Sequence, residues 1–174
     1  MNLQKTGAAI GKKFACLLAG AFTVLSCAGV NVALAEGAKS MSADLLQHLE
    51  KDKFSEIRSV GDLPDSVKAF YTKQSKVDDI KKVMADTGKD FNSSCVQTPG
   101  GAPSKSFLVA AKSPGMCLLY YESGGFVLLD TIDMFKLDGA NAEKVWSSSM
   151  FKDHPETAEQ LVQAAKQRVK EPIK

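Results

Sequence analysis

The sequence has few residues of the types that most often carry enzyme chemistry. It holds two histidines, His48 and His154, which are separated by more than half the chain. A triad of serine, histidine and acid needs a histidine beside the serine, and a zinc site needs about four ligands. Each histidine is more simply interpreted as a helix-end or turn residue. The composition therefore favours a protein that is not an enzyme and that holds neither a metal nor another cofactor.

Signals for nucleotide and nucleic-acid binding are also missing. Gly100-Gly101 and Gly124-Gly125 lack the spacing and the lysine of a phosphate-binding loop. Charges of both signs alternate along the chain, as in residues 78–82, whereas a nucleic-acid binder is expected to gather its lysines and arginines on one face. We therefore expect no nucleic-acid partner.

Charge is absent from a long segment near the start of the chain. Residues 1–35 carry three lysines and no acid, and Phe14–Ala35 carries no charge at all. The triplet Ala33-Leu34-Ala35 fits a signal-peptidase site. We predict that residues 1–35 are a signal peptide and that residues 36–174 form a single domain, exported to the periplasm or secreted. Without those three lysines, 19 basic residues stand against 20 acidic ones.

Two alternatives stay open for this segment. Its 22 uncharged residues are enough for a bilayer-spanning helix, which needs about 20, so the signal could stay uncleaved as an anchor. The stretch Val24-Leu25-Ser26-Cys27 resembles the lipobox of bacterial lipoproteins, in which the cysteine is acylated. That interpretation makes Cys27 the lipidation site of an outer-membrane lipoprotein. Under all three interpretations the domain is exported.

Cysteine is scarce in the predicted domain. Cys16 and Cys27 lie in the signal segment, which leaves Cys95 and Cys117. In an oxidising compartment two such cysteines most simply form one disulfide, and chain entropy assigns this cross-link on the order of 3 kcal/mol. We therefore predict a disulfide between Cys95 and Cys117.

The first half of the predicted domain is mainly helical. Apolar spacing and capping residues predict a short helix over residues 42–51 and another that starts around Asp62-Leu63-Pro64. Residues 77–86 suit a helix or an edge strand equally well. Residues 92–105 are rich in serine, glycine and proline and are expected to be a loop.

The second half alternates short β-prone runs with glycine-containing turns, which is typical of antiparallel hairpins. It predicts strands over Ser106–Lys112, Met116–Glu122 and Phe126–Leu137, and a fourth around Lys144–Ser148. Pro155 and the charges that follow it predict a final amphipathic helix. We expect an α+β domain, an antiparallel β-meander of about four strands with N-terminal helices and a C-terminal amphipathic helix.

The longest predicted strand, Phe126–Leu137, is apolar on both faces. A sheet of this kind must be covered on both sides. Helices are expected on one face, and a loop, the terminal helix or a partner on the other.

Three carboxylates lie in or beside the predicted strands. If Glu122, Asp130 and Asp133 converged, Glu122 could act with Asp130 or Asp133 in a carboxylate-dependent hydrolase. Asp130 and Asp133 are three residues apart, so a regular strand would point them to opposite faces. Hydrolysis is therefore an alternative function.

The most patterned stretch is CLLYYESGG, residues 117–125. With the apolar run that follows, it resembles uncharacterised exported bacterial proteins in which a strand ending in His-Tyr-Glu-x-Gly-Gly turns into a second apolar strand. Tyr121, Glu122 and the two glycines match, and Tyr120 replaces the histidine. The resemblance implies export and a hairpin, and it implies no activity.

From these patterns we expect a non-catalytic binding module of the periplasm or cell envelope. Its partner would be a protein or a small ligand of the envelope, and it would meet the membrane only through an anchor or an uncleaved signal. Tyr120, Tyr121 and Glu122 are the candidate binding residues, because aromatic side chains on an open sheet face often engage partners. Turn chemistry and strand alternation also explain this stretch as structure alone.

Overall fold

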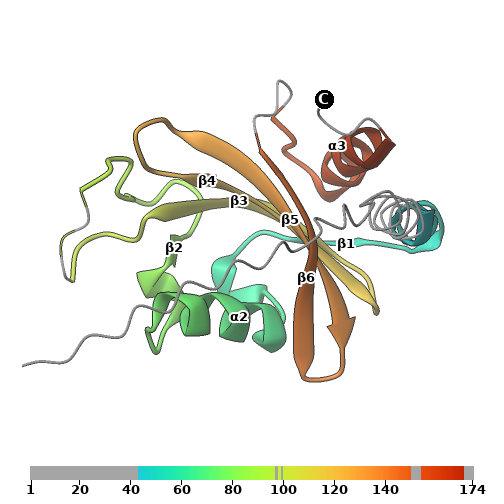
Figure 1. Cartoon of the computed structure of the whole chain (residues 1–174), viewed down its shortest axis with the longest axis horizontal. Coiled ribbons are helices and arrows are strands. Elements are labelled where there is room, and N and C mark those ends of the chain that lie inside the picture. Colours follow the sequence, from blue (N-terminus) through green and yellow to red (C-terminus); the bar gives the residue numbers. More distant parts are fainter. Residues whose placement is uncertain (1–42, 97, 99, 150–153, 171–174) are drawn as a thin grey trace, which may run out of the picture.

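The computed structural model describes residues 43–96, 98, 100–149 and 154–170. The predicted signal, its cleavage site, the candidate anchor and the candidate lipidation site at Cys27 lie outside the described residues. Within them the chain forms a six-stranded sheet with helices on both faces (Figure 1).

The sheet follows the order β1-β3-β4-β5-β6, and β2 pairs with β3 beside this path. The antiparallel meander consists of β3 (Lys105–Lys112), β4 (Met116–Ser123), β5 (Leu129–Asp138) and β6 (Asn141–Ser149). Two short strands are added at the outer edge of β3: β1 (Ser55–Ile57) is antiparallel to it, and β2 (Met84–Ala85) is parallel.

The helices divide between the two faces. A helix over residues 43–51 and α3 (Ala158–Lys170) lie on one face. The other face is covered by α2 (Asp65–Ser75) and by two 3-10 turns, η1 (Val60–Asp62) and η2 (Ile80–Lys82). The predicted α+β class and antiparallel sheet are confirmed. The predicted count of about four strands is too low, because strands of two and three residues are too short to show alternation.

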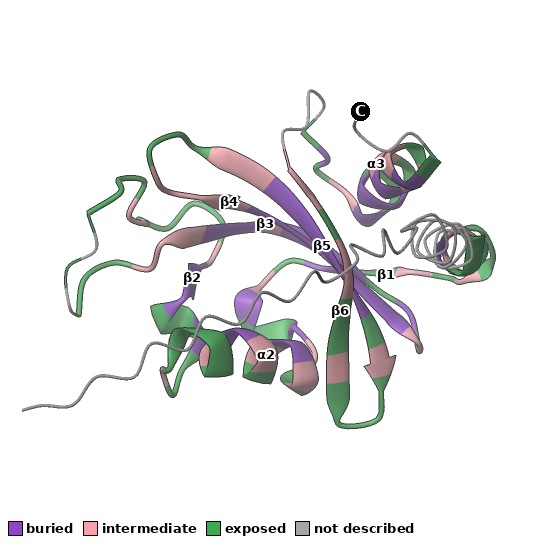
Figure 2. Cartoon of the chain, in the orientation of Figure 1, coloured by how far each residue is buried: buried purple, intermediate pink, exposed green. Residues whose placement is uncertain are grey.

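Two apolar cores result, one on each side of the sheet. Successive side chains of β4 point to opposite faces, so Leu118 and Tyr120 enter the core beneath α3, and Leu119 and Tyr121 enter the core above α2. Figure 2 shows buried residues along the middle of β3, β4 and β5 and on the inner sides of the helices. The chain's own helices therefore cover both faces of β3, β4 and the middle of β5, whereas no residue of β6 is fully buried.

The predicted disulfide is wrong, since Cys95 and Cys117 are both free thiols. Cys117 is fully buried near the first residue of β4, and burial raises the pKa of its thiol to about 12. The loop that carries Cys95 meets the far end of β4, where the Gly125 amide donates to the Ser93 carbonyl over 3.2 Å. Six residues of strand span about 20 Å, and a disulfide needs Cα atoms within about 7 Å. The number of cysteines in the sequence could not show that the loop with Cys95 contacts the end of β4 opposite Cys117.

One predicted strand boundary also moves. The strand expected to start at Phe126 starts at Leu129, and Phe126, Val127 and Leu128 form the exposed β4–β5 turn. Alternation could not place this boundary, because the apolar run continues unbroken through the turn.

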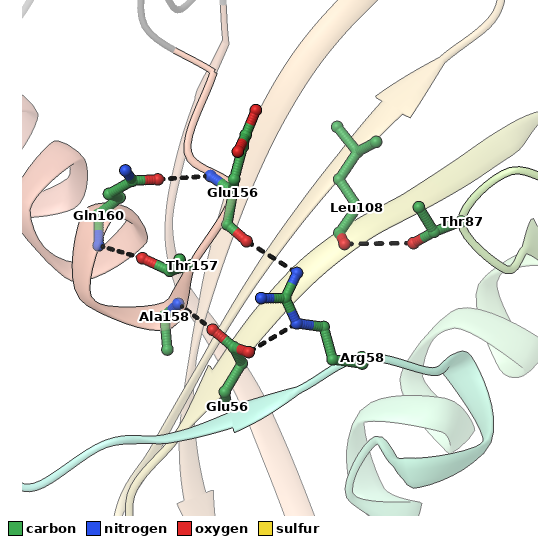
Figure 3. Close-up of polar contacts among 8 residues, drawn as sticks. All are labelled: Glu56, Arg58, Thr87, Leu108, Glu156, Thr157, Ala158 and Gln160. Carbon is green, nitrogen blue, oxygen red and sulfur yellow. Dashed lines mark hydrogen bonds and ion pairs between the residues drawn. The ribbon is translucent and has the colours of Figure 1, made fainter.

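β1 fixes the start of α3 through side-chain contacts (Figure 3). A carboxylate oxygen of Glu56 accepts a hydrogen bond from the Ala158 amide over 2.8 Å, at the first residue of the helix. Arg58 Nε donates to the other oxygen over 2.6 Å, and Arg58 Nη1 donates to the Glu156 carbonyl over 2.9 Å. Inside the turn, Thr157 Oγ1 accepts from the Gln160 amide over 3.2 Å. A negative charge at this end also complements the helix dipole.

The Glu56 contact predicts a dependence of stability on pH. The hydrogen bond from the Ala158 amide, opposed by partial burial and aided by Arg58, lowers the pKa of Glu56 below its ordinary 4.5. A carboxyl group with a lowered pKa stabilises the folded state above its unfolded pKa, and this contribution disappears as the pH falls through the folded pKa. Glu56→Gln should therefore unfold at lower urea than the wild type at pH 7, and the difference should shrink below pH 4.5. Glu143→Gln, on the exposed part of β6, is the control. An equal difference at pH 7 and in acid would contradict the contact.

Candidate functional site

Strand register separates the three predicted carboxylates. Glu122 lies directly opposite Asp130 in the β4–β5 pair, so these two share the face beneath α3. Asp133 lies on the other face, toward α2. The three carboxylates therefore do not converge. Tyr120 and Tyr121 are both buried, one on each face, so neither lies on an open face of the sheet.

Asp133 is the centre of a buried polar cluster. Its side chain is 0% exposed. Tyr71 donates a hydrogen bond to Oδ2 over 2.5 Å, and Tyr121 donates to the same oxygen over 3.2 Å. Ser147 donates to Oδ1 over 2.5 Å, and the ammonium of Lys144 lies 3.5 Å from Oδ2. A buried carboxylate is stable only with such partners.

A β-bulge makes this cluster possible. Phe135 pairs with Lys144 and Met134 pairs with Trp146, so Val145 is an extra residue in β6. Without it, Lys144 and Ser147 would face opposite sides of the sheet. Strict alternation along the sequence therefore could not have placed both of them at Asp133.

Burial, together with the nearby Asp133 carboxylate, keeps the two tyrosines of this cluster protonated. Burial raises the pKa of Tyr71 and of Tyr121, and the nearby carboxylate raises both further. Both phenols thus remain protonated donors. Lys105 lies with its ammonium 4.7 Å from the centre of the Tyr121 ring, and burial lowers the pKa of Lys105 while Asp133 opposes this shift. The cluster is closed and paired, and it ties α2 to β4, β5 and β6.

A second polar cluster lies on the face beneath α3. His154 Nδ1 is 3.0 Å from Asp130 Oδ2 and 3.0 Å from the Tyr120 hydroxyl. Burial raises the pKa of Tyr120, and the charges of Asp130 and Glu122 raise it further, so this phenol stays protonated. The Asp130 side chain is 12% exposed, whereas that of His154 is 66% exposed. An aspartate thus holds one nitrogen of a largely accessible imidazole.

His154 borders a surface hollow. A hollow of about 370 Å³ is lined by His154, Pro155 and the outer side of α3. Sequence reasoning gave His154 only a turn role, because its partner Asp130 is far away along the chain. The spacing of Asp130 and His154 in the sequence does not predict the contact between them.

The most exposed large apolar residues of the described chain lie in two segments that meet at one end of the sheet. Phe126 is 96% exposed, Val127 64% and Leu128 51%, and Val96 in the preceding loop is 68% exposed. We call these four residues the apolar end. They belong to two segments, 91–104 and 123–129, neither of which holds a charged residue.

Backbone contacts brace the apolar end. A Cβ atom on Gly124 would overlap the Asn92 carbonyl oxygen and lie 2.7 Å from the Ser93 Cα. The Gly124 amide donates to the Ser104 carbonyl over 2.9 Å, and the Gly125 amide donates to the Ser93 carbonyl. Gly124 is thus needed for the close approach of the loop, whereas a Cβ atom on Gly125 would make only an ordinary contact with the Val127 carbonyl oxygen.

Comparison with known proteins gives no match: neither a family model, nor a curated protein, nor a solved structure is similar to this chain. The resemblance of the hairpin to exported bacterial proteins therefore stays a prediction. Among the described residues, no helix is both long and apolar enough to span a bilayer. No set of three or more histidine, cysteine, aspartate and glutamate side chains in the described ranges is placed to bind a metal ion.

The Asp133 cluster predicts a large effect of a small substitution. Asp133→Asn keeps the size of the side chain, but it removes the charge and leaves donors facing an amide nitrogen. We expect a loss of about 3 kcal/mol in the free energy of unfolding, measured by urea denaturation. Asp138→Asn, the same change at the exposed end of β5, should shift it by less than about 0.5 kcal/mol. Equal stability of the two variants would refute the structural role of the cluster.

Proposed function

We propose that this protein is an exported protein of the periplasm or cell envelope that acts as a non-catalytic binding module. Its partner would be a protein or small ligand of the envelope. The observation that supports binding is the apolar end, where exposed apolar side chains come together on a braced turn.

Export rests on the predicted signal in residues 1–35. Mass spectrometry of the protein recovered from cells should give an N-terminus at Glu36. An acylated Cys27 would instead establish the lipoprotein alternative, and an intact residue 1 would establish the uncleaved anchor. Recovery of the full-length protein in the cytosol alone would refute export.

The apolar end has the properties of a contact surface. Together the exposed parts of Val96, Phe126, Val127 and Leu128 amount to on the order of 400 Å² of apolar surface. Apolar surface of this size is often functional. The bracing contacts hold it in place before binding, which lowers the entropy lost on association. Because Tyr120 and Tyr121 are buried, the proposal assigns binding to the exposed turn that follows them and not to these two side chains.

Capture from envelope extract tests this proposal. Wild-type protein should retain a component that Phe126→Asp loses by roughly tenfold or more, because a charge in an apolar contact must be desolvated. Phe126 is almost fully exposed, so the variant should keep the wild-type melting temperature. Gln163→Glu, which adds a negative charge on the outer side of α3, should capture as the wild type does. Equal capture by Phe126→Asp and wild type would contradict binding at the apolar end.

A second candidate function is hydrolysis at His154, which the Asp130 contact favours. Asp130 would orient the imidazole, and its free nitrogen would accept a proton from water. This version of the carboxylate-dependent hydrolase uses Asp130, with Glu122 beside it, and leaves Asp133 in its structural role.

Chromogenic esters and glycosides can test hydrolysis. Turnover by the wild type should fall by about a hundredfold or more in His154→Ala and in Asp130→Asn. It should persist in His48→Ala, whose imidazole contacts Asp52 at the end of another helix. Absence of turnover across the panel, or an equal loss in the His48 variant, would remove this candidate.

A further inference from the structure

We infer that the apolar end is a self-association surface, on which a second copy of this chain docks. The inference rests on the proposed function and names the partner for the same surface. Three observations support it: the absence of charge around the patch, its position relative to the start of the domain, and its area.

The absence of charge permits a contact between identical copies. In a two-fold interface only residues near the axis meet their own copies, so a charge near the axis faces a like charge. Segments 91–104 and 123–129 hold no charged residue, although 24% of the chain is charged. The charged residues that border these segments are Asp90 and Lys105 beside the loop and Glu122 and Asp130 in the hairpin. Glu122 and Asp130 lie behind the tip and face α3, and the Lys105 ammonium lies over the Tyr121 ring. Two copies that meet through the turn itself therefore place no like charges at the axis.

The position of the patch argues against the start of the domain as its occupant. In Figure 1 the helix over residues 43–51 lies at the right, whereas the β4–β5 turn and the loop before β3 lie at the left, along the longest axis. The seven residues from Glu36 to Ser42 can span at most about 25 Å. In the predicted mature chain this short segment is joined to the helix on the side of the molecule opposite the apolar end.

A lipid surface is also a poor occupant. Peripheral membrane sites combine apolar side chains with lysines or arginines that contact anionic headgroups. The two segments of the apolar end contain neither. Nothing at this end would hold the domain against charged lipids.

The area predicts a weak dimer. Stable interfaces bury about 800 Å² on each partner, and the apolar patch supplies on the order of half of this. The uncharged backbone and the small polar residues of the surrounding loop would supply the rest. Association should therefore be reversible and depend on protein concentration.

The Cys95 thiol can report the contact, since it is exposed and next to Val96. With oxidised glutathione as the oxidant, the Cys95 thiolate attacks the glutathione disulfide, forms a mixed disulfide and releases one glutathione thiol. The Cys95 thiolate of the second copy then attacks that mixed disulfide and releases the second glutathione thiol. Buried Cys117, with its raised pKa, should not react.

The experiment is sedimentation velocity on the protein as recovered from the exported fraction, under reducing conditions, from roughly 1 to 300 µM. Wild type should shift from monomer to dimer within this range, and Phe126→Asp should need roughly tenfold or more protein for the same shift. Cys95→Ser should dimerise like the wild type but give no covalent dimer with oxidised glutathione. Cross-linking through Cys95 should be slower in Phe126→Asp than in wild type.

Several outcomes would overturn self-association. These are a wild type that stays monomeric throughout the range, an unchanged dimer constant in Phe126→Asp, equal cross-linking rates in wild type and Phe126→Asp, and binding of the monomer to neutral lipid vesicles in place of dimerisation. The test of self-association and the test of the proposed function can give different results. If the wild type is monomeric but Phe126→Asp still loses a captured envelope component, binding at the apolar end stands and only the second copy is wrong.

Discussion

The fold depends on one strand that is buried on both faces. Six successive residues of β4, Met116 to Tyr121, are shielded from solvent. Because alternate side chains point in opposite directions, this strand requires an apolar layer on each side, and the helices before and after the meander supply those layers. In β3, β4 and the middle of β5 it leaves no open face, whereas no residue of β6 is fully buried. Asp133, the charged residue within this double core, is kept there by donors from α2, β4 and β6.

The same covering of the sheet explains where exposed apolar residues lie among the described residues. With both faces covered, exposed apolar surface is left at the end of the hairpin, where the turn carries three large apolar residues beyond the core. The loop before β3 folds onto the two glycines of that turn and fixes it. A turn that served only to connect β4 and β5 would need neither the apolar residues nor the bracing. The exposed apolar residues at this end are thus a consequence of how the sheet is covered elsewhere.

Local patterns predicted the parts of the fold that depend on neighbours in the sequence. Alternation and glycine turns placed β3, β4 and β6, and charge at both ends placed α3.

Contacts between residues far apart in the sequence could not be predicted from local patterns. β1 is defined by its pairing with β3 and by Glu56 at the start of α3. The Asp133 cluster needs a bulge in β6, and the Asp130 contact with His154 joins segments that the sequence keeps apart. The disulfide prediction failed for the same reason, since two cysteines can flank one strand and still lie at its opposite ends.

The account depends most directly on the hairpin tip being held in place before it meets a partner. Amide hydrogen exchange at single-residue resolution measures this in the isolated protein. If the loop braces the turn, the Gly124 and Gly125 amides, which donate to Ser104 and Ser93, should exchange roughly tenfold or more slowly than the amides of residues 126–128. Equal exchange rates across residues 124–128 would mean that the apolar end is not preformed, and the account would be contradicted.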